Sequence, residues 1–196
     1  GVTMIRDLIR PALGFTALLM VLTGAVYPGV VTAIASLCFP RQAAGSLVTV
    51  DGRAVGSELI GQPFAGAGYF HPRASAAGHD GTASGGTNRG PTDRRLADTL
   101  VAEGVRRAVE DGAAPGRVPA DMATHSASGL DPHVSPANAR IQAARVARAR
   151  GVDVARVSAL VERRVEARQF GILGEPRVNV LLLNLDLDRA LGRPGR

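Results

Sequence analysis

The chain contains no lysine: all 23 basic residues among its 196 are arginine. This absence excludes the Walker-A phosphate loop, the ATP-binding lysine of protein kinases and enzymes that form a Schiff base through a lysine amine. The single cysteine, Cys38, excludes an internal disulfide framework and a cysteine-rich metal site. The sequence therefore excludes these lysine-dependent nucleotide sites, catalysis through a lysine Schiff base and a cysteine-rich metal site.

Aromatic residues are also scarce, with no tryptophan, two tyrosines and five phenylalanines. The net charge of +6 would by itself suit a nucleic-acid partner, and arginines concentrate between Arg140 and Arg168. Nucleic-acid modules add stacking aromatics or a groove-reading motif, however, and the sequence offers few of the first and none of the second. We therefore expect no nucleic-acid partner and a solvated or partner-facing arginine surface. The alternative, an arginine-rich nucleic-acid module, predicts steeply salt-dependent binding.

Charge is missing from one long stretch near the N-terminus. Residues 11–40 contain no ionisable side chain except Tyr27 and Cys38. As a helix, the apolar part of this stretch would be about 38 Å long, enough to cross a hydrocarbon core of about 30 Å. We expect a retained transmembrane helix at 13–38, preceded by a short N-terminal segment at 1–12.

A cleaved signal peptide is the alternative interpretation of the same stretch. Arg6 and Arg10 would form its basic region, and Ala33-Ile-Ala35 resembles a cleavage site. The apolar run is about twice as long as the usual 7 to 15 residues, which favours the anchor. Cleavage after Ala35 would instead release a secreted or periplasmic binding protein. The flanking arginines balance, so charge does not determine which way the anchor crosses.

The apolar stretch has two further features. Pro28 predicts a kink within the span. Small residues recur at four-residue spacings and predict a face against which another membrane helix can pack, namely Ala17, Ala25, Gly29 and Ala33.

After the anchor, residues 41–196 predict one mixed α/β domain. An alternating segment at 46–50 followed by Asp51-Gly52 predicts a hairpin. Residues 61–91 are rich in glycine and proline, and are either a disordered linker or an ordered functional loop.

Three helices and a strand complete the expected domain. The helices are predicted at 92–111, 135–151 and 153–165 from their caps and apolar spacing. Thr92 is the expected cap of the first, whose buried face would consist of Leu96, Leu100, Val101, Val105 and Val109. The apolar run from Arg177 to Leu187 predicts a central, buried strand.

Few side chains suggest catalysis. Ser128, Asp131 and His133 lie within six residues, but triad members normally come from separate elements, so we interpret this segment as a turn before a Ser135 cap. The four histidines lack the spacing of metal ligands on one helix face. Consecutive glycines after Ser84 suit a weak anion-binding turn.

Several motifs together resemble one family over nearly the whole chain. They are Tyr69-Phe70-x-x-Arg73, Ser84-Gly85-Gly86-Thr87-Asn88, Val118-Pro119-x-Asp121, Ser128-Gly129-Leu130-Asp131-Pro132-His133, Gln142-x-x-Arg145 and Phe170-Gly171 to Asp188, the last including Asn179 and Asn184. In this order behind one apolar span, they resemble the KdpC family, the C chains of bacterial high-affinity potassium-transporting ATPases. His71 departs from the family, which usually has an aromatic or a different polar residue there.

The resemblance implies a non-catalytic subunit, with no catalytic residue or metal site of its own. Its partners would be a potassium-binding A chain, an ATP-hydrolysing B chain, a small F peptide and the lipid bilayer. It would cross the bacterial inner membrane once, with its C-terminal domain in the periplasm. No cofactor is expected to bind tightly, and ATP only together with the B chain.

Two functions follow from the resemblance. In the first, the subunit stabilises the complex and acts as a catalytic chaperone that raises the ATP affinity of the B chain. In the second, the domain is a periplasmic cap on the A chain that shapes ion access and contacts no nucleotide. The candidate motif or interface residues are Ser84, Gly85, Gly86, Asn88, Ser128, Gly129, Leu130, Asp131, His133, Gln142, Arg145, Asn179 and Asn184.

Overall fold

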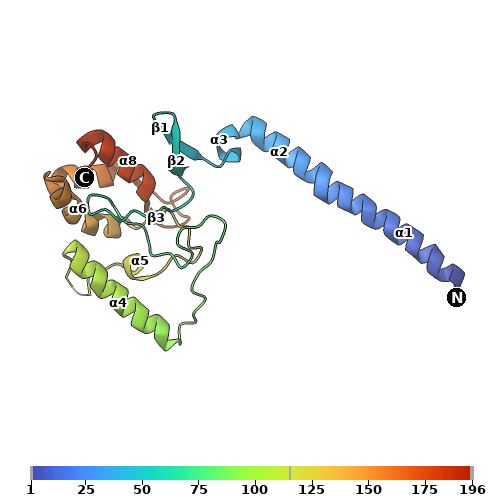
Figure 1. Cartoon of the computed structure of the whole chain (residues 1–196), viewed down its shortest axis with the longest axis horizontal. Coiled ribbons are helices and arrows are strands. Elements are labelled where there is room, and N and C mark those ends of the chain that lie inside the picture. Colours follow the sequence, from blue (N-terminus) through green and yellow to red (C-terminus); the bar gives the residue numbers. More distant parts are fainter. Residues whose placement is uncertain (1, 115, 195–196) are drawn as a thin grey trace. The chain divides into compact units, whose positions relative to one another are not determined.

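The computed structural model describes residues 2–114 and 116–194, and the chain forms two compact units (Figure 1). The first comprises residues 1–47 and the second residues 48–196. A long apolar helix is thus followed by a mixed α/β domain, as the sequence predicts.

The first unit is one continuous helical run made of three segments. These are α1 (Val2–Val21), the π turn η1 (Leu22–Val26) and α2 (Tyr27–Cys38), followed by the short helix α3 (Pro40–Ala43). Residues 5–38 are long and apolar enough to cross a membrane, and none of this span is buried against the rest of the chain. Helix already begins at Val2, so the expected N-terminal segment continues into the span as helix.

Where the sequence predicts a kink at Pro28, the helix has a π turn just before the proline. A proline in a helix lacks an N–H and its ring crowds the preceding turn. In this chain Tyr27 N–H bonds to the carbonyl of Leu22, five residues back, which widens the helix there. The backbone accommodates the proline without ending the helix.

The domain begins with a hairpin. Its strands are β1 (Leu47–Val50) and β2 (Arg53–Ser57). Asp51 and Gly52 both have positive φ, 51° and 76°. Two left-handed residues in a row are what a tight two-residue hairpin requires, so this prediction is confirmed.

Residues 61–91, all of which the structure describes, contain neither helix nor strand. They are nevertheless ordered by long-range contacts, because Phe70 is completely buried and Ser75 forms a bridge with Ser126. The disordered-linker interpretation is wrong.

Helices account for much of the described chain after this loop, and the last of them, α8, follows a strand. Four helices come first. They are α4 (Arg94–Asp111), α5 (Ala120–Ala123), α6 (Pro136–Arg150) and α7 (Val154–Arg163). Ser135 and Asp153 cap α6 and α7 as predicted, whereas α4 is capped by Asp93 rather than Thr92.

The predicted buried face of α4 is partly wrong. Val101, Val105 and Val109 are 67%, 55% and 78% exposed, whereas Ala108 and Asp111 are buried. Helix α4 instead packs through a small side chain, Ala108, and a polar one, Asp111. Asp111 can be buried because it is paired with a buried arginine of α6. Hydrophobicity alone therefore selected the wrong side of the helix.

The expected strand at 177–187 is also wrong. Only β5 (Arg177–Asn179) is extended, and helix α8 (Val180–Leu191) follows it directly. Asn179 caps this helix by accepting a hydrogen bond from Leu182 N–H. The leucine-rich run then buries residues at helical spacing, including Val180, Leu183 and Leu187. Leucine has a high helix propensity, and the Asn179 side chain caps the first turn. Both favour a helix over the expected strand.

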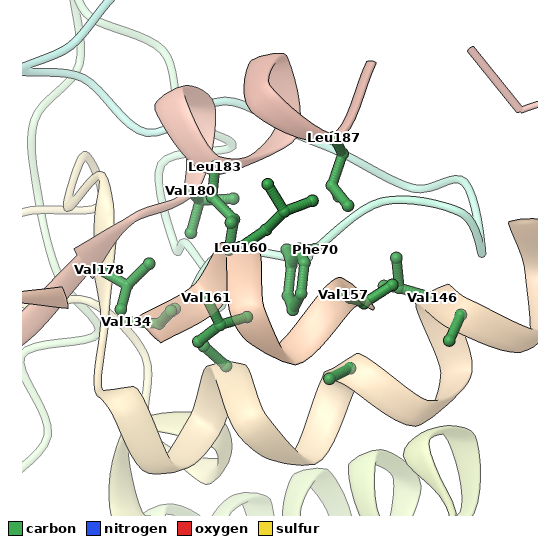
Figure 2. Close-up of a cluster of buried hydrophobic side chains, with 13 residues drawn as sticks. Phe70, Val134, Val146, Val157, Leu160, Val161, Val178, Val180, Leu183 and Leu187 are labelled. Atoms are coloured by element: carbon green, nitrogen blue, oxygen red, sulfur yellow. The ribbon is translucent and has the colours of Figure 1, made fainter. Parts of the chain in front are cut away.

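Strand β5 lies in the middle of a small antiparallel sheet. Its neighbours are β3 (His133–Val134) and β4 (Val165–Glu166), in the order β3-β5-β4. The core is formed by α6, α7, α8 and this sheet around the Phe70 side chain, as Figure 2 shows. Its main members are Phe70, Val134, Val146, Val157, Leu160, Val161, Val178, Val180, Leu183 and Leu187.

We predict that Asn179→Ala destabilises the domain by about 2 kcal/mol, because it removes the α8 cap and the hydrogen bond from Nδ2 to the Glu58 carbonyl. Asn179→Ser is the matched control, since its hydroxyl oxygen can cap α8 while the second bond is lost. Denaturant unfolding of the full-length chain in detergent measures both. Equal stability of Asn179→Ala and the unmodified chain would contradict the assigned cap.

Candidate functional site

The extended segment at Phe70 and His71 is held by two side-chain amides from different helices. Asn184 on α8 accepts from Phe70 N–H at 2.8 Å and donates to its carbonyl at 3.0 Å. Gln142 on α6 does the same for His71, at 2.7 and 3.0 Å. We call these two contacts the carboxamide brackets. They satisfy four buried backbone groups, each of which would cost about 1–3 kcal/mol if left unpaired.

Arg145, one turn after Gln142, connects the brackets to α4. Its Nε donates to Asp111 Oδ1 at 2.6 Å, and Nη2 donates to Gln142 Oε1 at 2.8 Å. Nη1 donates to the carbonyls of Ala67 and Tyr69. The Arg145 and Asp111 side chains are 7% and 0% exposed. Removing one partner of such a pair strands a buried charge and costs about 3–5 kcal/mol.

A further chain of hydrogen bonds extends from Gln142 to the start of α6. Gln142 Nε2 donates to Asn138 Oδ1 at 2.7 Å, and Asn138 Nδ2 donates to Asp121 Oδ2 at 2.9 Å. The Asp121 carboxylate also accepts from the backbone and hydroxyl of Ser135. Helices α4, α5, α6 and α8 are thus joined to the 61–91 loop by one buried polar network.

His71 is the titratable group at the centre of this network. Its side chain is 8% exposed; Nε2 lies 3.1 Å from the Gly66 carbonyl and Nδ1 lies 3.0 Å from Glu110 Oε1. Arg107 Nη1 lies 3.3 Å from the same Nδ1. Burial, followed by the charge of Arg145, lowers the pKa of His71 below 6.5, and the hydrogen bond with the Gly66 carbonyl and the Glu110 charge only partly oppose this.

The Ser84-Gly85-Gly86 segment packs against the Ser128-Gly129 turn. Ser84 Oγ and Gly85 N–H both donate to the Ser128 carbonyl, at 3.0 and 2.9 Å. A Cβ on Gly86 would lie 2.7 Å from the Ala127 carbonyl oxygen. Gly129 has φ +70°, and a Cβ there would lie 2.7 Å from the Gly85 carbonyl oxygen. The glycines therefore permit close contact between two backbone segments.

Asp131 ties this turn to the loop. Its Oδ2 accepts from Arg73 Nη1 at 3.0 Å, and its Oδ1 accepts from His133 N–H at 2.9 Å. Burial by itself raises the pKa of Asp131, but the hydrogen bonds from His133 and Arg73 outweigh it and lower that pKa. Ser128 Oγ contacts Ser126 Oγ and accepts from Leu130 N–H. Each of these groups serves the turn, as the sequence suggests.

The structure brings the candidate residues into two neighbourhoods. Gln142, Arg145 and Asn184 converge on the Phe70–His71 segment. The second neighbourhood contains Ser84, Gly85, Gly86, Ser128, Gly129, Leu130, Asp131 and His133. Asn179 lies apart from both as the α8 cap, and Asn88 is exposed.

The small-residue face of the membrane helix lies outside these neighbourhoods. Ala17, Ala25, Gly29 and Ala33 are all exposed, and a Cβ on Gly29 would meet nothing within 4 Å. Within the described part of the chain, then, this face has no partner, and its role in helix packing stays a prediction.

Sequence reasoning missed how several groups are connected: Asp111, Asp121, Asn138 and His71 in the polar network, and Arg73 as the partner of Asp131. The only local signal was the spacing of Asn138, Gln142 and Arg145, which places three polar side chains on one face of α6. Their partners are far away in the sequence, so pattern alone could not pair them.

Metal ligation finds no support in the described residues, where no three His, Cys, Asp or Glu side chains form a group able to hold an ion. A cleft of about 300 Å³ borders His71 and has Arg73, Arg106, Arg107 and Glu110 in its wall. The Glu110 carboxylate lies within 4 Å of Arg106, Arg107 and His71, so it balances part of this positive charge.

Comparison with known proteins identifies close relatives of the chain. The family model described as K+-transporting ATPase, c chain, matches residues 9–189. A potassium-transporting ATPase KdpC subunit from Gemmatimonas aurantiaca is 57% identical over 183 residues, covering 92% of each chain. The same-named subunit from Myxococcus xanthus is 61% identical over 176 residues, covering 88% of this chain and 83% of the relative. That from Nitratidesulfovibrio vulgaris is 54% identical over 190 residues, covering 94% and 95%.

We predict that Gly86→Ala destabilises the domain by about 1–3 kcal/mol, because the new methyl group would press against the Ala127 carbonyl. Gly85→Ala is the matched control: nothing lies within 4 Å of the position that its methyl group would occupy, and its φ is not left-handed. Thermal unfolding of both full-length variants measures the difference. If the two variants lost equal stability, the proposed backbone packing would be wrong.

We predict that the chain loses stability as the pH falls below about 6.5. Because the pKa of His71 is lowered in the folded state, the unfolded chain binds a proton more readily in this range. Well above pH 6.5 both states are neutral at this residue, and the effect disappears. His71→Gln keeps a neutral polar side chain and should flatten the dependence between about pH 7.5 and 5. Denaturant titrations at several pH values test this, and equal slopes for the two proteins would contradict it.

Proposed function

The chain belongs to the K+-transporting ATPase C-chain family, KdpC, and from this premise we propose that it is a non-catalytic, membrane-anchored subunit that stabilises the ATP-driven potassium transporter. The anchor is the apolar helical run at 5–38, which fits a single crossing of the membrane. Its partners are the potassium-binding A chain, the ATP-hydrolysing B chain and the small F peptide. The C-terminal domain lies on the periplasmic side of the bacterial inner membrane.

The observation that carries this proposal is that the motif side chains serve the interior of the domain. Gln142 and Asn184 bind backbone of the 61–91 loop, and Arg145 is paired with Asp111. Side chains that are bonded in this way hold the domain in its shape. They are not available to attack or polarise a substrate. A rigid domain fixed beside the membrane suits assembly of larger subunits.

We propose that the subunit raises the ATP affinity of the B chain by coupling through the complex. In the Ser84-Gly85-Gly86 turn, the hydroxyl and one N–H already bond to the Ser128 carbonyl, which weakens the case for a phosphate cradle there. We therefore propose that the subunit binds no cofactor tightly, and that ATP meets it only as part of a complex with the B chain. Chaperone action would then be an allosteric coupling, typically worth about 5–150-fold in affinity.

The second candidate is a periplasmic cap on the A chain that shapes ion access. The same use of the Ser84–Gly86 donors within the fold favours a role that needs no nucleotide contact. The two candidates differ in which apparent affinity changes when the domain is lost: that for ATP under chaperone coupling, or that for potassium under a cap.

We predict that a complex containing only residues 1–47 of this chain loses ATP-driven potassium uptake in reconstituted vesicles. The apparent affinities for ATP and for potassium are measured on the same preparations, to separate the two candidates. A complex with full-length Gly85→Ala is the control. Uptake equal to that of the full-length complex would contradict the proposal, and protease protection in inverted vesicles checks the side on which the domain lies.

A further inference from the structure

The strands β4 and β5 form a hairpin whose end is apolar and exposed. The connection contains Phe170, Ile172 and Leu173, which are 83%, 76% and 55% exposed. Phe170 is the most exposed large apolar side chain in the described part of the domain. We call residues 170–173 the tip. Such a concentration of apolar surface on a small protrusion is typical of an interaction site.

The stem below the tip is held in register by paired charges. Val165 pairs with Val178 and Glu166 with Arg177 in the strand ladder. Arg177 Nε donates to Glu166 Oε2 at 2.9 Å, and toward the tip Arg168 Nη2 donates to Glu175 Oε2 at 2.6 Å. Exposed ion pairs contribute little stability singly, but here both link opposite sides of one hairpin.

The tip itself is closed by backbone hydrogen bonds. Gln169 and Leu173 exchange two bonds of 2.9 Å, and Gly171 and Ile172 N–H groups bond back to residues 168 and 169. Phe170 has φ +54°, an uncommon and costly conformation for an aromatic residue. This turn fixes the backbone that carries the exposed apolar side chains before anything binds. Preorganisation of this kind lowers the entropic cost of association.

The charges around the tip argue against an anionic lipid surface as its occupant. Arg168 and Arg177 are each paired with a glutamate, so the stem carries two positive and two negative charges. Binding to anionic membranes depends on unpaired basic residues. A neutral polar rim around an apolar centre is instead the arrangement of a protein–protein contact.

A second copy of the chain offers no suitable receptor among three hollows of its domain. Each is lined by charged side chains that an apolar tip would leave desolvated and unpaired. The first contains Arg106 and Glu110, the second Arg145 and Arg148, and the third Asp188 and Arg189.

We propose that the tip is an anchor that inserts into an apolar pocket on the extramembrane surface of another subunit of the transporter. This inference rests on the proposed function, because it requires that the chain works within that complex. Only residues 39–47 separate the apolar helix from the second unit, so the domain remains close to the other membrane subunits. An exposed aromatic side chain with apolar neighbours on a protrusion suits the core of a protein–protein contact.

Photo-crosslinking in the complete complex tests the occupant directly. Ile172→p-benzoylphenylalanine is introduced into the full-length chain, which is produced with the other subunits, irradiated in membranes and analysed by mass spectrometry. We expect an adduct with another transporter subunit. Ala159→p-benzoylphenylalanine, on an exposed part of α7, is the control. Adducts only with lipid, adducts only with a second copy, or a yield no higher than the control would each overturn the proposal.

A variant provides the second measurement. Phe170→Ala combined with Ile172→Ala should reduce the other subunits recovered with the tagged chain by roughly tenfold or more. Val101→Ala with Val105→Ala, which removes comparably exposed side chains from α4, should leave recovery unchanged. Unfolding of the isolated full-length variant checks that it is folded. Recovery unchanged in the tip variant, or equally reduced in the α4 variant, would overturn the assignment.

Failure of the tip assignment can be told apart from failure of the proposed function. If the unmodified chain recovers no transporter subunit, the proposed function itself is wrong. If it recovers them but Ile172 crosslinks to none, the complex stands and only the tip assignment is overturned.

Discussion

The fold depends on the carboxamide brackets that hold Phe70 and His71. A loop of 31 residues without helix or strand passes through this domain, and one of its side chains is the centre of the core. Such a loop would bury unpaired N–H and carbonyl groups if nothing replaced a neighbouring strand. Asn184 and Gln142 take the place of that strand. Arg145 and Asp111 then fix the helix that carries Gln142 to α4.

This arrangement explains why a domain with several distinctive motifs presents few groups suited to chemistry. Its amides, its buried arginine and its tightly packed glycines are engaged with backbone or with one another. What remains at the surface are shape, charge and apolar side chains. A subunit of a transport complex acts on its partners through such surface properties. Both the proposed assembly role and the tip depend on them.

Much of the architecture was predictable from local signals. The apolar run, the Asp51-Gly52 turn and the Ser135 and Asp153 caps each depend on neighbouring residues, and each is found where the sequence places it. The strand expected at 177–187 failed because an apolar run fits both a buried strand and a buried helix, and the Asn179 cap was overlooked. The α4 face failed for another reason: its buried Asp111 depends on Arg145, 34 residues away. Contacts of that kind are set by tertiary structure and leave no periodic trace.

The distance in sequence between the two partners of each bracket also affects how the domain is made. Phe70 and Asn184 are 114 residues apart, so their contact forms only after the chain has closed a very long loop. Until α8 has left the ribosome, the loop lacks one of its two amide partners and the core lacks Leu183 and Leu187. The Phe70 segment can therefore be fully bracketed, and the core completed, only after α8 has emerged and packed against residues made more than a hundred positions earlier.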